Sequence, residues 1–173
     1  MAETVSASPA LILFALLFFG IMAAAAVYDL ISYTIPNFLS LLLIGGFAVL
    51  ALMLALPWQL VLSHAGAGLA MLAIGWGMFA IGLLGGGDAK LFAATSLWMG
   101  WGGIINYLII FSICGGLLAL CLILFRRIAL PAGLAEMTWI ATLHDKKQGV
   151  PYGIALAAGA MLAPPALLAA AGM

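Results

Sequence analysis

Two aspartates are the residues of this sequence best placed to do chemistry. Asp29 follows the first long apolar run, and Asp88 belongs to residues 85–90, which read Gly-Gly-Gly-Asp-Ala-Lys between two other apolar runs. Only 6% of the residues are charged, and an acid at the edge of an apolar segment usually faces a cavity or a partner. Two carboxylates that lie close together in a medium of low dielectric constant do not both ionise easily, so such a pair shares one proton.

A carboxylate pair that shares one proton can hydrolyse a peptide bond. The ionised carboxylate takes a proton from water, and the protonated one donates a hydrogen bond to the scissile carbonyl. This chemistry needs no metal and no cofactor, and the sequence indicates neither, because it holds no Cys-x-x-Cys pair and its two histidines are far apart. The alternative is that Asp29 and Asp88 are interfacial charges without a chemical role.

The residues around Asp88 fit a substrate-binding role. Gly85 and Gly87 lack a Cβ atom, so the backbone there can bend sharply and let an extended peptide approach. Lys90 stands two positions after the acid. It either biases the carboxylate pair electrostatically or extends its ammonium group to the lipid headgroups, and the sequence favours neither interpretation.

The composition indicates an integral membrane protein. The chain has 173 residues, of which 68% are hydrophobic, and its mean hydropathy is +1.34. A soluble domain is nearer half apolar and a quarter charged. A spanning helix needs roughly 20 residues, so the chain has room for about six. We expect an all-α bundle of about six transmembrane helices that forms one membrane-embedded domain over residues 1–173.

The apolar runs and the turn residues between them predict where the spans lie. They are expected at residues 9–28, 37–56, 64–84, 91–101, 104–125 and 151–170. The fourth is only about 17 Å of helix, which is short of the roughly 30 Å membrane core. Either that helix begins within the glycines, or Asp88 lies inside the membrane. Residues 128–148 form the longest loop, and its middle is expected to form a helix lying on the membrane interface.

The basic residues predict the orientation. With six spans and the N-terminus outside, every Lys and Arg falls on the inner side: Lys90, Arg126, Arg127, Lys146 and Lys147. Cytoplasmic loops carry an excess of such residues. The orientation places Asp29 and Asp88 together at the cytoplasmic face.

Three short motifs together resemble the type IV prepilin peptidase family. Asp29 is followed by Ile35-Pro36-Asn37, as in the first active-site motif of the family. Residues 85–88 match its Gly-x-Gly-Asp motif. The last span opens with Pro151-Tyr152-Gly153, as the last span of the family commonly does. Gly-x-Gly-Asp alone is weak, but the three motifs stand in the family's order over nearly the whole chain.

The resemblance implies a multi-pass aspartic endopeptidase of the bacterial cytoplasmic (inner) membrane. Its substrates would be prepilins or pseudopilins, each with a basic leader followed by a hydrophobic helix, and its surroundings membrane lipid; nucleic acid is not an expected partner. Asp29 and Asp88 would be the catalytic pair. The supporting motif residues would be Gly85, Gly87, Lys90, Pro36, Asn37, Pro151, Tyr152 and Gly153. Pro36, Asn37 and the residues from Pro151 to Gly153 are expected to shape the cleft.

The same resemblance implies a short form of the enzyme. Long members of the family carry an extra cytoplasmic domain with paired Cys-x-x-Cys motifs and also methylate the new N-terminus. The two cysteines of this chain, Cys114 and Cys121, lie in one apolar run. The chain therefore looks like the form found with Flp pili, which is expected to cleave without methylating.

The sequence argues against one rival and leaves a second class open. The presenilin and signal-peptide-peptidase group also uses Tyr-Asp and Gly-x-Gly-Asp, and Pro165-Ala166-Leu167 spells its third motif. That triplet lies at the outer end of the last span, far from the aspartates, and the chain lacks the nine spans of the group. Membrane aspartates also serve as proton relays, so a proton-coupled transporter or a non-catalytic pilus or secretion assembly subunit is the second class. Cleavage of a prepilin separates the protease from both members of that second class.

Overall fold

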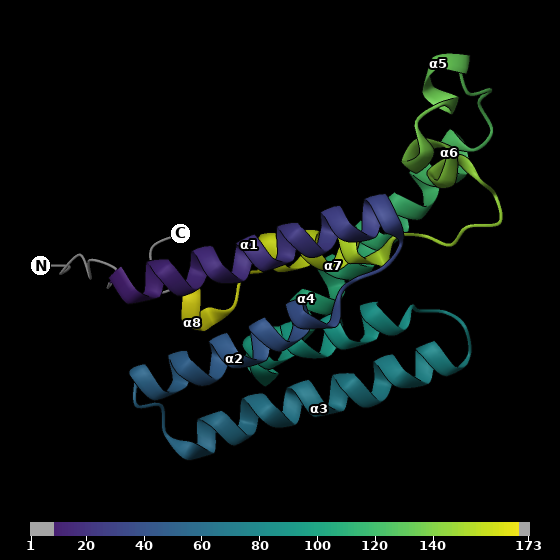
Figure 1. Ribbon diagram of the computed structural model, residues 1–173. Coiled ribbons are helices and arrows are strands. Elements are labelled where there is room, and N and C mark those ends of the chain that lie inside the picture. Colours follow the sequence, from purple (N-terminus) through teal and green to yellow (C-terminus); the bar gives the residue numbers. More distant parts are fainter. Residues whose placement is uncertain (1–8, 170–173) are drawn as a thin grey trace, which may run out of the picture.

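The structure is a computed structural model that describes residues 9–169, with the side chain of Ala132 excepted. Residues 1–8 and the end of the last predicted span, from residue 170, lie outside the described residues. All regular structure between residues 9 and 169 is helical (Figure 1). The helices are α1 (Pro9–Ser32), α2 (Asn37–Met53), α3 (Trp58–Ala80), α4 (Gly86–Phe125), α5 (Ala132–Ala135), α6 (Thr138–His144), α7 (Tyr152–Leu162) and α8 (Ala166–Ala169). The all-α prediction is confirmed for this part of the chain.

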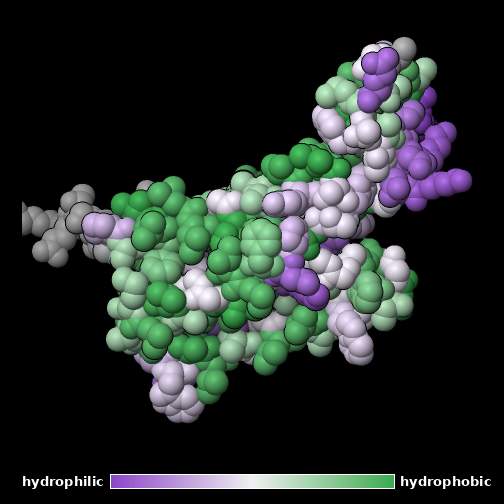
Figure 2. Space-filling view, viewed as in Figure 1, coloured by the Kyte–Doolittle hydropathy of each residue, from purple (hydrophilic) through white to green (hydrophobic). Residues whose placement is uncertain are grey.

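The surface of the bundle is that of a membrane protein. Among the described helices, α1, α3 and α4 are long and apolar enough to cross a membrane, and α2 and α7 are shorter apolar helices. Large apolar side chains such as Leu52 and Trp76 are more than two-thirds exposed. Figure 2 shows apolar residues over most of the visible face of the bundle, with hydrophilic residues gathered over the segment that carries α5 and α6. This surface suits lipid rather than water, as expected of an integral membrane protein.

Helix α4 consists of two arms that fold back on each other. The aromatic ring of Phe92 lies 6.2 Å from that of Tyr107 and 5.8 Å from that of Phe111. In one straight helix, Phe92 and Tyr107 would stand about 22 Å apart. The break between the arms is Gly100, whose backbone is not helical. The first arm lies along α3 and the second leads towards α6 (Figure 1), so the predicted break between residues 91–101 and 104–125 is confirmed.

The turn at Gly100 is specific to glycine. Its φ of 58° and ψ of −179° fall outside the regions open to other residues. A Cβ atom added there would lie 2.7 Å from Cε1 of His64. His64 is buried, and its Nδ1 lies 2.8 Å from the carbonyl oxygen of Leu97. Since a carbonyl oxygen can only accept a hydrogen bond, Nδ1 of His64 carries the proton. The ring thus donates a hydrogen bond to the last turn of the first arm.

The core lies where the first arm of α4 meets α1 and α2. Trp98 is fully buried, and its indole N–H donates a 2.9 Å hydrogen bond to the carbonyl oxygen of Leu43 in α2. Its ring centroid lies 5.1 Å from that of Phe18 in α1 and 5.9 Å from that of Phe47 in α2. A buried indole contributes a large apolar area provided that its N–H finds a partner, so Trp98 ties the three helices together.

The first and third helices are longer than the sequence predicts. The predicted span 9–28 ends before Asp29, but α1 continues to Ser32, and Asp29 lies inside the helix. The Ser32 hydroxyl donates a 2.7 Å hydrogen bond to the carbonyl oxygen of Tyr28, which supports this extra turn. The third predicted span begins at residue 64, but α3 begins at Trp58. Pro57 precedes it as the N-cap residue, and proline near a helix start costs little.

The fourth predicted span also begins earlier than expected. Its helix starts at Gly86, after the N-cap residue Gly85, so Asp88 lies in the first turn. This confirms the alternative in which the helix begins within the glycines. The first arm, residues 86–99, is then about 21 Å long.

The prediction of one helix over residues 151–170 is wrong. Helix α7 ends at Leu162, and α8 begins only at Ala166. Pro164 and Pro165 stand between them. Proline has no N–H to donate, and the residue before a proline is disfavoured in helical conformation. Ala163 accordingly has φ −126° and ψ 73°.

The predicted helical middle of the loop 128–148 is two short helices. α5 and α6 extend away from the bundle next to the end of α4 (Figure 1). Arg126, at the end of α4, holds this segment by three hydrogen bonds to backbone carbonyls. Its Nε donates to Leu143 at 2.9 Å, its Nη1 to Gln148 at 3.0 Å and its Nη2 to Gly149 at 2.9 Å. Arg126 therefore fixes the chain directly before the start of α7.

Replacing the turn glycine should destabilise the fold. We expect Gly100→Ala to lower the free energy of unfolding by at least about 1–2 kcal/mol, because its backbone is left-handed and its Cβ would overlap the His64 ring. The melting temperature in detergent should fall by at least about 2–4 °C. Gly102→Ala is the control, since a Cβ there meets nothing within 4 Å. Equal melting temperatures for the two variants would contradict this account of the turn.

Candidate functional site

The predicted motifs meet at one end of the helix bundle. The C-terminal end of α1 and the N-terminal ends of α2, α4 and α7 converge there, on the right of Figure 1. Each helix end contributes a motif residue: Asp29 from α1 and Asn37 from α2 for the first motif, Asp88 from α4 for the second, and Gly153 from α7 for the third. The fold thus brings together three motifs that lie far apart in the sequence.

Asp29 is buried and bonded to the start of α7. Its side chain is 3% exposed, and its Oδ2 accepts a 2.6 Å hydrogen bond from the backbone N–H of Gly153. Gly153 is the second residue of α7, where backbone N–H groups have no partner within the helix. The positive end of the helix dipole favours a carboxylate at this place. Asp29 therefore caps α7 from another helix.

Gly153 leaves room for that carboxylate. A Cβ atom on Gly153 would lie 2.9 Å from Oδ2 of Asp29 and 2.8 Å from Cδ1 of Ile35. Both distances are well inside van der Waals contact, so a larger residue would displace Asp29. The glycine of the Pro-Tyr-Gly motif is thus required by close packing.

Asp88 is buried in the first turn of α4. Its side chain is 8% exposed, and its Oδ2 accepts a 3.2 Å hydrogen bond from the backbone N–H of Gly85, the N-cap residue. This contact satisfies one of the N–H groups that a helix start leaves unpaired. Oδ1 of Asp88 is buried and has no hydrogen-bond partner in the described part of the chain. One oxygen therefore anchors the side chain and the other stays available.

Both carboxylates line the same cavity. Its volume is about 250 Å³, and its lining comes from the end of α1, the connection between α1 and α2, and the starts of α2 and α4. The residues are Asp29, Tyr33, Thr34, Ile35, Asn37, Gly85, Gly86, Gly87 and Asp88. Within the chain, the arrangement is a small pocket with two buried acids in its wall.

The glycines before Asp88 set the shape of this cavity. A Cβ atom on Gly87 would lie 3.1 Å from the carbonyl oxygen of Ile35, so glycine lets the start of α4 pack against the connection between α1 and α2. A Cβ on Gly85 would lie 2.7 Å from Oδ2 of Asp88. The two glycines therefore leave room for Ile35 and for the Asp88 carboxylate. From the sequence, we expected the glycines to leave room for the substrate.

Lys90 has a partner on a neighbouring helix. Its Nζ donates a 2.8 Å hydrogen bond to Oδ1 of Asn37. Asn37 is the first residue of α2, directly after the N-cap residue Pro36. The contact joins the first arm of α4 to the start of α2 at the rim of the cavity, which neither of the two sequence interpretations of Lys90 included.

Pro151 and Tyr152 lie beside the pocket without lining it. Pro151 is fully buried and is the N-cap residue of α7. The ring of Tyr152 packs against α4 at Gly115, where an added Cβ would lie 3.6 Å from its Cε1. The two residues position the start of α7, and with it the N–H that binds Asp29.

Four residues that line the pocket were not predicted as site residues: Tyr33, Thr34, Ile35 and Gly86. Tyr33 and Ile35 belong to the connection that the glycines of α4 pack against. Tyr33 has a φ of 52°, which is rare for a bulky residue and marks local strain. Burial raises the pKa of the Tyr33 hydroxyl, and the positive charge of Arg126 opposes that shift. In the sequence, the polar connection between two apolar runs pointed to this segment, and Ile35 also stood in the Ile-Pro-Asn motif.

Comparisons with known proteins identify the family. The model of the type IV leader peptidase family matches residues 16–120, which include both aspartates. A prepilin leader peptidase/N-methyltransferase of Dickeya chrysanthemi is 33% identical over 132 residues, which are 73% of this chain and 47% of that protein. The chain thus spans about half the length of this relative. No solved structure matches the chain significantly. The chain belongs to the type IV leader peptidase family.

Proposed function

We propose that this chain is a membrane aspartic endopeptidase that cleaves the leader peptide of type IV prepilins. The observation that carries the proposal is the pair of buried carboxylates, Asp29 and Asp88, in the wall of one cavity. Membership of the type IV leader peptidase family supports the same reaction. The cavity, at about 250 Å³, has room for a short unwound stretch of peptide and a water molecule.

The proposed reaction is a direct attack of water on the scissile carbonyl. One carboxylate takes a proton from the water as its oxygen bonds to the carbonyl carbon, while the other acid hydrogen-bonds the carbonyl oxygen. The carbon–nitrogen bond then breaks, and the leaving amine receives the proton that the first carboxylate took. The products are a leader with a free carboxylate and a pilin with a free amine.

The hydrogen bonds of the two aspartates favour different roles. Asp29 accepts a short bond from an N–H at the start of α7, and such a donor stabilises a negative charge. Asp88 keeps one buried oxygen without a partner in the described part of the chain, which suits a protonated oxygen that donates to the substrate. We therefore assign proton abstraction to Asp29 and the hydrogen bond to the carbonyl to Asp88.

The membrane arrangement is part of the proposal. Six helical segments cross or enter the bilayer: α1, α2, α3, the two arms of α4, and α7 with α8. The N-terminus lies outside, and the end that carries the cavity faces the cytoplasm of a bacterium, in its inner membrane. Arg126, Arg127, Lys146 and Lys147 all lie at the cavity end, next to the start of α7, and basic residues favour the cytoplasmic side.

The substrate class is also part of the proposal. The relative from Dickeya chrysanthemi is named for two activities, leader cleavage and N-methylation. Both cysteines of the sequence lie in α4, and no Cys-x-x-Cys pair is present. We propose that the chain cleaves Flp-type prepilins and does not itself methylate the product. Mass spectrometry of the cleaved pilin should then show an unmodified N-terminal amine.

Removing either buried carboxylate should abolish cleavage. We expect Asp29→Asn and Asp88→Asn each to lower kcat/KM for a co-reconstituted prepilin at least about 100-fold, because each role in the reaction needs an ionisable oxygen. Asp145→Asn is the matched control, since Asp145 is exposed, lies outside the cavity, and its carboxylate accepts a bond from the backbone N–H of Lys147. The proposed function fails if both cavity variants cleave at the rate of this control.

The pH profile tests the sharing of one proton. Only the singly protonated pair has both a base and a hydrogen-bond donor, so kcat/KM should fall at low pH and again at high pH. The profile of the purified chain in detergent or liposomes should therefore be bell-shaped. A rate that rises steadily with pH across the range where the fold is stable would argue for a single acting carboxylate.

Filling the space at Gly153 should impair the site. We expect Gly153→Ala to lower kcat at least about tenfold, because its Cβ would displace the Asp29 carboxylate that must lie within hydrogen-bond reach of the reacting water. Gly149→Ala is the control, since a Cβ there meets nothing within 4 Å. A change in KM alone, with kcat unaltered, would show that Gly153 does not position the reacting group.

A further inference from the structure

Helices α2 and α3 leave an open groove between them. Each packs against the first arm of α4: α2 through the bond from Trp98 to Leu43, and α3 through the close contact of Gly68 with Leu97. Two adjoining cavities, of about 510 Å³ and about 600 Å³, lie between α2 and α3. Ile44, Ala65 and Leu97 line both. The two cavities therefore form one groove, which we call the α2–α3 groove.

The groove has the length of a membrane-crossing helix. Its lining extends from Asn37, the first residue of α2, to Leu56, beyond its last turn. A helix of 17 residues, the length of α2, is about 26 Å long. This approaches the thickness of the membrane core, so an apolar helix can lie in the groove for most of its crossing.

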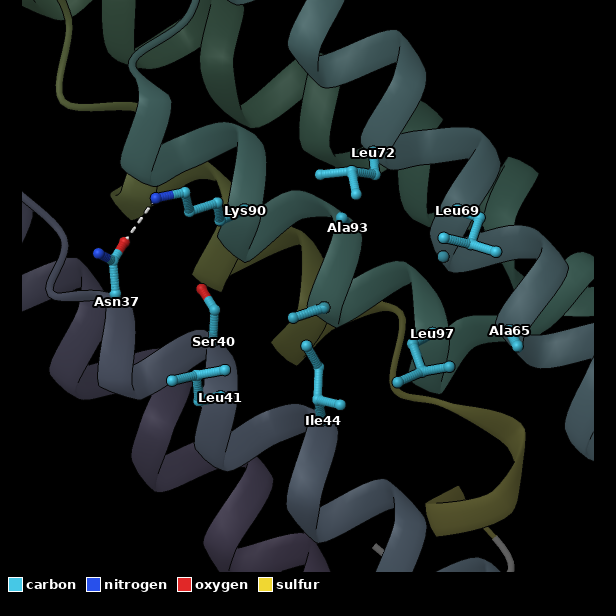
Figure 3. Close-up of a pocket in the computed structure, with 12 residues that line it drawn as sticks. Asn37, Ser40, Leu41, Ile44, Ala65, Leu69, Leu72, Lys90, Ala93 and Leu97 are labelled. Atoms are coloured by element: carbon cyan, nitrogen blue, oxygen red, sulfur yellow. Dashed lines mark hydrogen bonds between the residues drawn. The ribbon is translucent and has the colours of Figure 1, made fainter.

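One end of the groove opens at the proposed active site. Asn37 lines both the groove and the cavity that holds Asp29 and Asp88. The bond from Lys90 to Asn37 lies at this end, as Figure 3 shows. The remaining lining is almost entirely apolar, with side chains such as Ile44 and Leu97 around the open space (Figure 3). A chain that leaves the groove at Asn37 thus passes directly to the two carboxylates.

The floor of the groove suits a helix better than a lipid chain. Ala65, Ala93 and Ala94 line it, and small residues let a second helix approach closely. The hydroxyl of Ser40 also lines the groove, is buried, and has no hydrogen-bond partner among residues 9–169. A polar group of this kind at membrane depth finds a partner on another helix, whereas an acyl chain offers none.

We infer that the α2–α3 groove binds the apolar helix of the prepilin substrate, the helix that follows the cleaved bond. This inference rests on the proposed function. The substrate helix lies along α2 with its leader end at Asn37, and the chain ahead of the helix extends unwound into the cavity between Asp29 and Asp88. The groove selects a substrate that is anchored in the membrane and sets how far from the helix the cut falls.

A bulky side chain in the groove should block this binding. Ile44 is 46% exposed and lies where the two cavities meet; Ile74 on α3 is 50% exposed and lines neither. With a full-length Flp-type prepilin in liposomes, we expect Ile44→Trp to raise KM or lower kcat/KM at least about tenfold. Ile74→Trp should cleave at the wild-type rate. Equal cleavage rates for the two variants, beside an active wild type, would overturn the inference that the groove binds the substrate helix. The proposed function would remain intact.

Cross-linking shows which molecule occupies the groove. Ile44→Cys and Ile74→Cys are made in a background of Asp88→Asn, Cys114→Ala and Cys121→Ala, which holds the substrate uncleaved and removes the native thiols. With an added thiol oxidant such as copper phenanthroline, a prepilin with one cysteine in its apolar helix should form a disulfide with the first variant and not with the second. Equal cross-linking of both, cross-linking between two copies of this chain only, or none would overturn the inference. A wild-type chain that does not cleave the prepilin would instead overturn the proposed function on which it rests.

Discussion

The hydrogen bond from the Gly153 backbone to the Asp29 carboxylate is the contact on which the rest of the site depends. It joins α1 to α7 across most of the sequence, at a distance of 2.6 Å. It places a buried charge at the positive end of a helix, which lowers the cost of keeping an acid at membrane depth. The same contact therefore supports the packing of two helices and fixes the orientation of a carboxylate that we propose to be catalytic.

The second constraint is the reversal of α4 at Gly100. Because the chain turns there, the first arm lies between α2 and α3, and its N-terminal end carries Asp88 to the end of the bundle where Asp29 lies. The turn needs a left-handed residue next to the His64 ring, and only glycine fits. The reversal also holds α2 and α3 apart, so the α2–α3 groove and the carboxylate cavity are consequences of one backbone feature.

The sequence predicted the helices and the two acids because both signals are local. Apolar runs show where helices form. An acid between two such runs stands out because a carboxylate at membrane depth is costly and usually faces a cavity or a partner. The end of α1 and the start of α3 were misplaced because Asp29 and Trp58 look like boundary residues. The local bond from Ser32 to Tyr28 and the tertiary bond from Gly153 to Asp29 support the helix beyond Asp29. At the other boundary, Pro57 is the N-cap residue and lets α3 begin at Trp58. The roles of Ile35 and Tyr33 depend on packing between segments far apart in sequence, which no local pattern reveals.

The central claim is that the carboxylate pair directs a water molecule onto the scissile carbonyl. Single-turnover cleavage of a prepilin by the purified chain in ¹⁸O-labelled water, followed by mass spectrometry of the released leader, tests it most directly. The account predicts one ¹⁸O atom in the new C-terminal carboxylate of the leader. A leader that is released without label would contradict direct attack by water, because its new oxygen would then have come from the protein.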